Sequence, residues 1–234
     1  MKSILITRQK NQSQKIVRLF ENQGFTAFVE PLFLVEKIDV KKQIFDEEFS
    51  AAIVTSINAC FALNEFAFPK NNKIFAVGKK TAEELHKNGF KNIAVSRENS
   101  ASSLMDLIVK THEDKLGSLL YFHGSIINLD FEKELKNFGF KVKKILSYKT
   151  HESENFSSEL LEFSRQKIFD HVLIFSQNSA KIFEKLARKN NLLEYFKASQ
   201  LVCLSEKIRL DVENFQFQNP ITFDQFQILK NFYD

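Results

Sequence analysis

The sequence of 234 residues has few of the residues that mark a specialised chain. It contains only two cysteines, Cys60 and Cys203, which are far apart and form no CxxC pair. This excludes a disulfide framework and a thiolate metal site as first expectations. The apolar stretch before Arg8 is too short for a secretory signal, and no apolar run approaches the length of a membrane helix. We therefore expect a cytoplasmic protein without membrane association.

Charge of one sign and cofactor motifs are also lacking. The 33 basic and 29 acidic residues are mixed along the chain and leave a formal net charge of +4. Without a block of like charges, neither a nucleic-acid arm nor a polybasic membrane patch is predicted. The sequence has no GxGxxG, GxSxG or HExxH motif, and its histidines show no metal-ligand spacing. We expect no metal, no cofactor and no nucleic-acid partner.

Short apolar runs that alternate with amphipathic helical patterns fill most of the chain. The first run, "ILI", is followed by "NQSQKIVRLFENQG", in which Gly24 is placed to end a helix. The runs "AAIV", "KIFAV", "SLLYF", "HVLIF" and "QLVCL" are each followed by a helical pattern of about ten residues. This alternation predicts an α/β fold in which parallel sheets carry helices on both faces.

A weak internal repeat relates the two halves of the sequence. "ILITRQKNQSQKIVRLFENQGF" parallels "LLYFHGSIINLDFEKELKNFGF", and this places Gly24 opposite Gly139. In the same way Ser56 lies opposite Ser176, and "FAVGKKTAEEL" lies opposite "VCLSEKIRLDV". Three matching units in the same order favour a duplication. We therefore expect two similar α/β domains with a cleft between them.

Small polar side chains occur repeatedly where a predicted strand turns into a helix. These turns are Thr7-Arg8, Thr55-Ser56-Ile57-Asn58, Gly78 with Thr81, Gly124-Ser125, and Ser176 with Ser179. Ligands of parallel sheets bind at such strand ends, where helix N-termini attract anions. The same residues are also ordinary helix caps, which is the more frequent role for any single turn. Their recurrence favours an anion-binding site.

The order of these motifs resembles that of the uroporphyrinogen-III synthase family. The resemblance is carried by the opening "ILITRQKNQSQKIVRLFENQGF", then "IVTSINA", "AVGKKTAEEL", "ILSYKT" and "IFSQNSA". It runs over nearly the whole chain. The last family element reads "LSEKIRL" here, so that Ser205, Lys207 and Ile208 replace a glycine and two threonines.

The resemblance implies a discontinuous arrangement of two domains joined by two linker strands. One domain would comprise residues 1–33 plus 152–234, and the other residues 38–145. The linkers would be residues 34–37 and 146–151. From the repeat alone, the boundary would instead fall near the middle of the chain.

The resemblance also implies a reaction and its residues. The substrate would be hydroxymethylbilane, a linear tetrapyrrole polycarboxylate, which is cyclised with inversion of its last ring and loss of water. Tyr148 would be the catalytic acid. The residues expected to bind substrate are Arg8, Thr55, Ser56, Asn58, Gly78, Thr81, Ser176 and Ser179. A monomer is the simplest expectation for such an enzyme.

Two other hypotheses remain open at this point. Because "LSEKIRL" lacks expected donor side chains, the chain could be a non-catalytic two-domain module that binds a tetrapyrrole or another polyanion. On the residues alone it could also be an unrelated two-domain enzyme acting on a sugar or phosphate. Only a synthase would convert the bilane into the type III isomer of the macrocycle.

Overall fold

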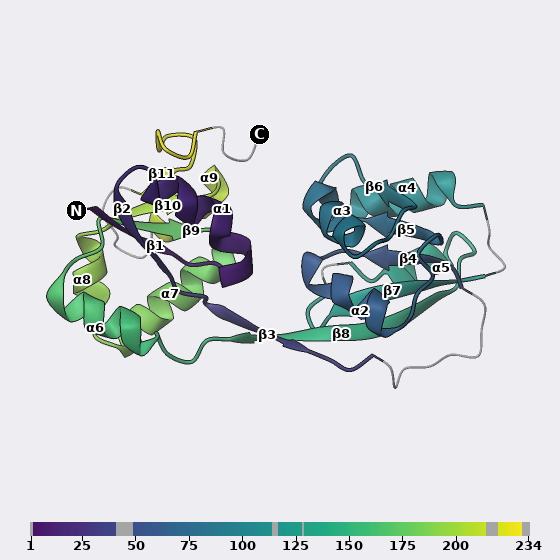
Figure 1. Ribbon diagram of the computed structural model, residues 1–234, viewed down its shortest axis with the longest axis horizontal. Helices are drawn as coiled ribbons and strands as arrows, with labels where there is room; N and C mark the ends of the chain where they lie inside the picture. Colours follow the sequence, from purple (N-terminus) through teal and green to yellow (C-terminus); the bar gives the residue numbers. More distant parts are fainter. Residues whose placement is uncertain (1, 41–48, 114–116, 128, 214–219, 231–234) are drawn as a thin grey trace. The chain divides into compact units, whose positions relative to one another are not determined.

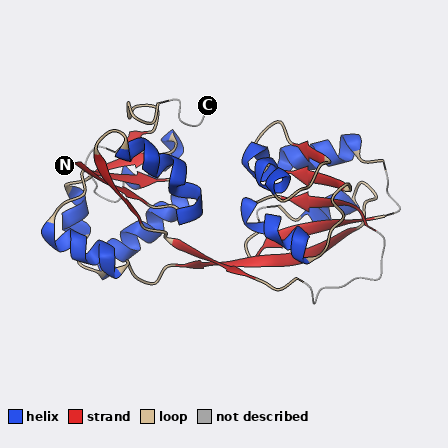
Figure 2. Cartoon of the chain, viewed as in Figure 1, coloured by secondary structure: helices blue, strands red, loops and turns tan. Residues whose placement is uncertain are grey.

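The chain folds into two compact units. A computed structural model describes residues 2–40, 49–113, 117–127, 129–213 and 220–230. Unit 1 comprises Met1–Leu34 and His151–Asp234, and unit 2 comprises Val35–Thr150. The predicted α/β class is confirmed in both units, because each contains a mainly parallel sheet with helices on its two faces (Figures 1 and 2).

Unit 1 is built around a sheet with the strand order β11-β10-β9-β1-β2 among the described residues. Its elements, in chain order, are β1 (Lys2–Ile6), α1 (Lys10–Glu21), β2 (Phe25–Val29), α6 (Ser158–Gln166), β9 (His171–Ile174), α7 (Gln177–Lys189), α8 (Leu193–Lys197), β10 (Gln200–Cys203), α9 (Glu206–Glu213) and β11 (Ile221–Thr222). All its strand pairs are parallel. Helix α1 packs on one face, and α6, α7 and α8 pack on the other.

Unit 2 is built around a sheet with the strand order β3-β8-β7-β4-β5-β6. Its elements are β3 (Phe33–Lys37), β4 (Phe49–Val54), the 3-10 helix η1 (Ile57–Ala59), α2 (Cys60–Glu65), β5 (Lys73–Ala76), α3 (Gly78–Lys87), β6 (Ile93–Val95), α4 (Ala101–Thr111), β7 (Ser118–Gly124), α5 (Phe131–Lys136) and β8 (Val142–Glu152). Helices α2 and α3 cover one face, and α4 and α5 cover the other.

The central strands are buried on both faces, which is why their sequences are continuously apolar. Ile4, Leu5 and Ile6 of β1 are fully buried, as are Ile53 and Val54 of β4. Side chains alternate between the two faces, so neighbours along one strand enter different cores. Removal of this apolar surface from water is the main stabilising contribution in each unit.

The sheet register supports the repeat that the sequence predicts. In unit 1, Ile4 lies opposite His171, and in unit 2, Leu119 lies opposite Ala51. These pairs follow the same alignment that places Gly24 opposite Gly139 and Ser56 opposite Ser176. Strands β1, β2, β9, β10 and β11 of unit 1 thus correspond to β7, β8, β4, β5 and β6 of unit 2, in the same spatial order. Each half of the sequence supplies strands to both units.

The chain passes between the units along two paired strands. The backbone N–H of Ser153 donates to the carbonyl of Leu32 at 3.0 Å, and that of Ile38 donates to the carbonyl of Ser147 at 2.9 Å. As the residue number increases from Leu32 to Ile38, the number of the partner decreases from Ser153 to Ser147. The pairing of β3 with β8 is therefore antiparallel. In the part of the chain that the structure describes, no helix has the length and apolarity needed to span a membrane.

Candidate functional site

In each sheet, two adjacent central strands connect to next strands that lie on opposite sides of the pair. The predicted site residues lie at the end of the sheet where these connections begin. In unit 1 the chain leaves β1 toward β2 and leaves β9 toward β10 on the other side. In unit 2 the chain leaves β4 toward β5 and β7 toward β8. Parallel α/β sheets bind ligands at the carboxyl ends of strands beside such a switch point. We call the end of each sheet at which its parallel strands have their carboxyl ends the carboxyl edge.

At the carboxyl edge of unit 1, Ser176 and Ser179 form a helix cap. The Ser176 hydroxyl oxygen accepts a hydrogen bond from the Ser179 backbone N–H at 3.0 Å and lies 2.6 Å from the Ser179 hydroxyl. Ser179 is buried. The Ser176 hydroxyl is therefore the N-cap of α7, the ordinary structural role of a serine at such a turn.

Arg8 lies beside this cap, directly after the neighbouring strand β1. Its Nε donates to Gln12 Oε1 at 2.9 Å, and its guanidinium carbon lies 5.2 Å from the centroid of the Phe175 ring. The preceding Thr7 is buried, and its hydroxyl donates to the Leu173 carbonyl. These contacts hold a half-buried cation between the ends of β1 and β9.

In unit 2, the predicted Thr55, Ser56 and Asn58 form the turn after β4. The Ser56 hydroxyl oxygen accepts a hydrogen bond from the Asn58 backbone N–H at 3.2 Å and so caps η1. The Thr55 hydroxyl has a different partner and lies 3.3 Å from the Tyr121 hydroxyl of β7. All three predicted residues are partly exposed at the carboxyl edge.

Gly78 and Thr81 begin the next helix of the same edge, α3. Gly78 has a φ of +73°, and the Asn99 side chain occupies the space that a Cβ would need. The positive φ favours glycine there, whereas the exposed Asn99 side chain could move aside. Thr81 is only 5% exposed, and its carbonyl accepts a weak hydrogen bond from the Cys60 thiol at 3.8 Å. Burial raises the pKa of that thiol to about 12, so Cys60 is a neutral packing residue.

Tyr148 lies on β8, next to the end of β7. Its ring packs directly on Gly124, where an added Cβ would lie 2.6 Å from Tyr148 Cε2 and 2.8 Å from its hydroxyl oxygen. The register of β7 and β8 shifts between His123 and Gly124, and this brings Gly124 opposite Tyr148. The half-buried Tyr148 phenol thus packs against the Gly124 backbone at the carboxyl edge.

Two further residues of β7, Tyr121 and His123, belong to this edge and were not predicted as site residues. Their rings lie 5.3 Å apart. Tyr121 is 3% exposed, and burial raises the pKa of its hydroxyl. The His123 Nδ1–H donates to the Gly124 carbonyl at 2.8 Å, while burial lowers the pKa of the ring below its ordinary 6.5. They are two positions apart in the apolar run "SLLYFHG", so in a strand they lie on the same face. This spacing is the sequence feature that could have identified them.

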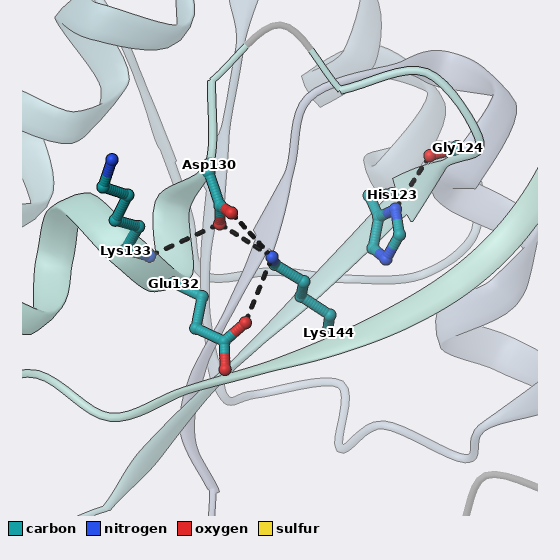
Figure 3. A network of polar contacts seen from close by, with 6 residues as sticks. All are labelled: His123, Gly124, Asp130, Glu132, Lys133 and Lys144. Carbon is teal, nitrogen blue, oxygen red and sulfur yellow. Dashed lines mark hydrogen bonds and ion pairs between the residues drawn. The ribbon is translucent and has the colours of Figure 1, made fainter.

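An ion network lies near the His123 ring (Figure 3), and its charges Asp130 and Lys144 also act on Tyr121. The Lys144 ammonium is 2.8 Å from Asp130 and 3.1 Å from Glu132. Asp130 also accepts a hydrogen bond from the Lys133 backbone N–H at the start of α5. The hydrogen bond between Lys144 and Asp130 lowers the pKa of the carboxyl and raises that of the ammonium. Lys144 is therefore already neutralised by protein carboxylates.

The described residues contain no group of three histidine, cysteine, aspartate or glutamate side chains placed to hold a metal ion. The predicted residues at the two carboxyl edges supply hydroxyls, backbone N–H groups at helix starts, the Arg8 guanidinium and the half-buried phenol of Tyr148. Such groups bind anionic arms and can donate a proton, which is the chemistry of positioning rather than of nucleophilic attack.

Comparison with known proteins places this arrangement in a family. The sequence profile described as uroporphyrinogen-III synthase HemD matches residues 14–228. The chain belongs to the uroporphyrinogen-III synthase family. The uroporphyrinogen-III synthase of Saccharomyces cerevisiae is 26% identical over 162 residues. That alignment covers 60% of this chain and spans 59% of the yeast enzyme.

Solved structures of the family share the fold. The uroporphyrinogen-III synthetase of Helicobacter pylori matches with a TM-score of 0.60 at 18% identity, over 94% of this chain and 92% of that one. A mutant uroporphyrinogen III synthase of Thermus thermophilus matches with a TM-score of 0.54 at 16% identity, over 98% and 95% of the two chains. These structures confirm the fold, and the profile match over residues 14–228 confirms the family resemblance of the sequence.

Proposed function

We propose that this protein is a uroporphyrinogen-III synthase, which cyclises hydroxymethylbilane with inversion of the last pyrrole ring and loss of water. The single observation that carries the proposal is the family match over residues 14–228. The polar carboxyl edges support it, because the substrate bears many carboxylate arms. We further propose that the enzyme works in the cytoplasm as a monomer and without a cofactor.

The reaction needs positioning more than it needs a strong catalyst. Protonation of the terminal hydroxyl lets it leave as water, and the pyrrole nitrogen then stabilises the azafulvene that remains. The substituted carbon of the last ring attacks this electrophile to give a spiro intermediate. Rearrangement and loss of one proton from that ring then give uroporphyrinogen III. Oxidation states do not change, and the net products are the macrocycle and water.

We assign the acid role to Tyr148. Its phenol is half-buried, and its ring lies against Gly124 with no intervening side chain. A positioned phenol is a weak acid suited to a leaving group that departs readily. The same packing restricts the ring to one orientation, which a catalytic proton donor requires.

The remaining predicted residues are proposed to hold the carboxylate arms. In unit 2 these are Thr55, Ser56, Asn58, Gly78 and Thr81, and in unit 1 they are Arg8, Ser176 and Ser179. Ser56 and Ser176 cap helices, so their contribution would come together with the N–H groups that they orient. Thr81 is nearly buried, so its contribution would be smaller than that of the exposed turn.

The decisive experiment supplies hydroxymethylbilane, generated in place, to the purified protein. The products are oxidised and the porphyrin isomers are separated by chromatography. A synthase gives the type III isomer in excess over the type I isomer that forms spontaneously. Type I product alone, with retained binding of the tetrapyrrole, would instead indicate a non-catalytic binding module.

A further inference from the structure

A tyrosine hydroxyl is buried at a position that the fold otherwise fills with hydrocarbon. Tyr121 of β7 is 3% exposed, and its ring packs edge-on against Phe131 at 5.0 Å. Its hydroxyl lies 3.3 Å from that of Thr55, which directly follows β4. This pair therefore bridges the two strands on either side of the switch point in unit 2.

Unit 1 shows that the architecture does not need this polar pair. Ile6 pairs with Leu173 in unit 1 as Tyr121 pairs with Ile53 in unit 2, so Ile6 and Tyr121 are equivalent. Phe175 follows β9 as Thr55 follows β4. Both unit 1 residues belong to one apolar core. The same place in the same fold is thus stable without hydroxyls.

The direction of the hydrogen bond follows from burial. The raised pKa of Tyr121 keeps its hydroxyl protonated at neutral pH. A buried hydroxyl proton without an acceptor is destabilising, and the Thr55 hydroxyl oxygen lies within hydrogen-bond distance to accept it. Thr55 is partly exposed, so its own proton can be donated to a group outside the protein. With Tyr121 as the donor, one lone pair of the Thr55 oxygen is occupied and the Thr55 proton is turned away from Tyr121.

We propose that Tyr121 is a positioning residue, which holds the Thr55 hydroxyl in the orientation that donates to a carboxylate arm of the substrate. This rests on the proposed function, because the ligand is the polycarboxylate of that reaction. Tyr121 does not touch the substrate and acts only through Thr55. The pair would contribute to binding and leave the chemical step unchanged.

The test uses the variants Tyr121→Phe and Thr55→Val, and the double variant, in the complete chain. The phenylalanine keeps the ring packing against Phe131 and removes only the hydroxyl. We expect each single change to raise KM by about 2- to 10-fold, the worth of one hydrogen bond, with kcat nearly constant. The double variant should match Thr55→Val alone, because Tyr121 has no other route to the substrate.

Tyr195→Phe in unit 1 is the matched control. The Tyr195 hydroxyl accepts from the Phe169 backbone N–H at 3.1 Å and donates to the Lys167 carbonyl, so its loss tests stability alone. If Tyr121→Phe lowers Tm as the control does and leaves KM unchanged, the inference is wrong. It is also wrong if the effects of the two single changes multiply in the double variant.

A second readout separates this inference from the proposed function. The affinity of each variant for uroporphyrin III, the oxidised octacarboxylate product, is measured from the change in the fluorescence of the porphyrin itself, because the chain has no tryptophan. The same pattern of weakening supports the positioning role even where the wild-type protein makes no type III isomer. Wild-type affinity in Tyr121→Phe and in Thr55→Val would contradict it, whether or not the wild-type protein turns over.

Discussion

Units 1 and 2 share one strand order but differ in how they employ the polar residues at their carboxyl edges. In unit 1, Ser176 and Ser179 bond to each other, and Thr7 bonds to a neighbouring strand. In unit 2, Thr55 pairs with a buried phenol, and the half-buried Tyr148 packs on Gly124. Ser56 and Ser176 cap their helices in the same way, whereas Thr55 of unit 2 stands where unit 1 has Phe175. We propose that the hydroxyl of Thr55 and the phenol of Tyr148 make the unit 2 edge the more important one for catalysis.

The sharpest test of this difference is Tyr148→Phe in unit 2. We expect kcat for the type III isomer to fall by about 100-fold, because a general acid contributes at least that much. The fold should be retained, since the ring still packs on Gly124. Rates are measured with bilane generated in place, and circular dichroism checks the fold. A variant that makes type III product at the wild-type rate would remove Tyr148 from the mechanism.

Gly124→Ala should have the next largest effect, on both stability and activity. The added methyl group would lie within 3 Å of the Tyr148 ring and force it to move. We expect a loss of about 1–3 kcal/mol in the free energy of unfolding, together with lower activity. The equivalent residue in unit 1 is Gln9, which makes no side-chain cap for α1, so Gln9→Ala should be nearly neutral. Denaturant titration compares the two, and equal losses would show that the units are not different here.

The two serine caps offer a direct comparison of equivalent residues. Ser176→Ala removes the cap of the long helix α7 and should cost about 1 kcal/mol of stability. Ser56→Ala removes the cap of the short η1 and should cost less. If substrate arms depend on the unit 2 turn, Ser56→Ala should raise KM more than Ser176→Ala does. The opposite order in KM would place the more important contact in unit 1.

The smallest effect is expected from pH. Each unit has a strand histidine, His171 in β9 and His123 in β7, whose pKa is lowered by burial below the ordinary 6.5. The unfolded chain therefore binds protons first as pH falls, and stability is lost below about pH 6.5. Tm should rise with pH up to that value and then level off.

His171→Gln should remove the contribution of unit 1 to the rise of Tm with pH. The neighbouring charges are Asp170 and Lys2 for His171, and Asp130 and Lys144 for His123. A slope that stays unchanged in His171→Gln would show that His123 and other groups account for it.

The sequence predicted the parts of this molecule that depend on local pattern. The strands and helix α7 were expected because their apolar residues repeat over enough positions, and Ser176 was recognised as a possible cap. The short α8 and β11 were not foreseen, because they have too few residues to show a period. Family and fold class are confirmed, whereas the roles of the individual residues remain predictions.

The pairing of Thr55 with Tyr121 could not be predicted in the same way. The two residues are 66 positions apart in the sequence, and their contact depends on the register between β4 and β7. The seat of Tyr148 on Gly124 likewise depends on a register shift between β7 and β8. Neither the register between β4 and β7 nor the shift between β7 and β8 can be recognised from a short stretch of sequence. The geometry of the carboxyl edge of unit 2 is therefore known only from the structure.

The two paired strands that join the units also determine when each unit can be completed during synthesis. Unit 2 is one continuous stretch, Val35–Thr150, whereas unit 1 waits for residues after His151. Strand β1 lies in the middle of its sheet and cannot obtain its partner β9 until most of the chain has left the ribosome. We therefore expect unit 2 to fold first, while the first strands of unit 1 remain exposed.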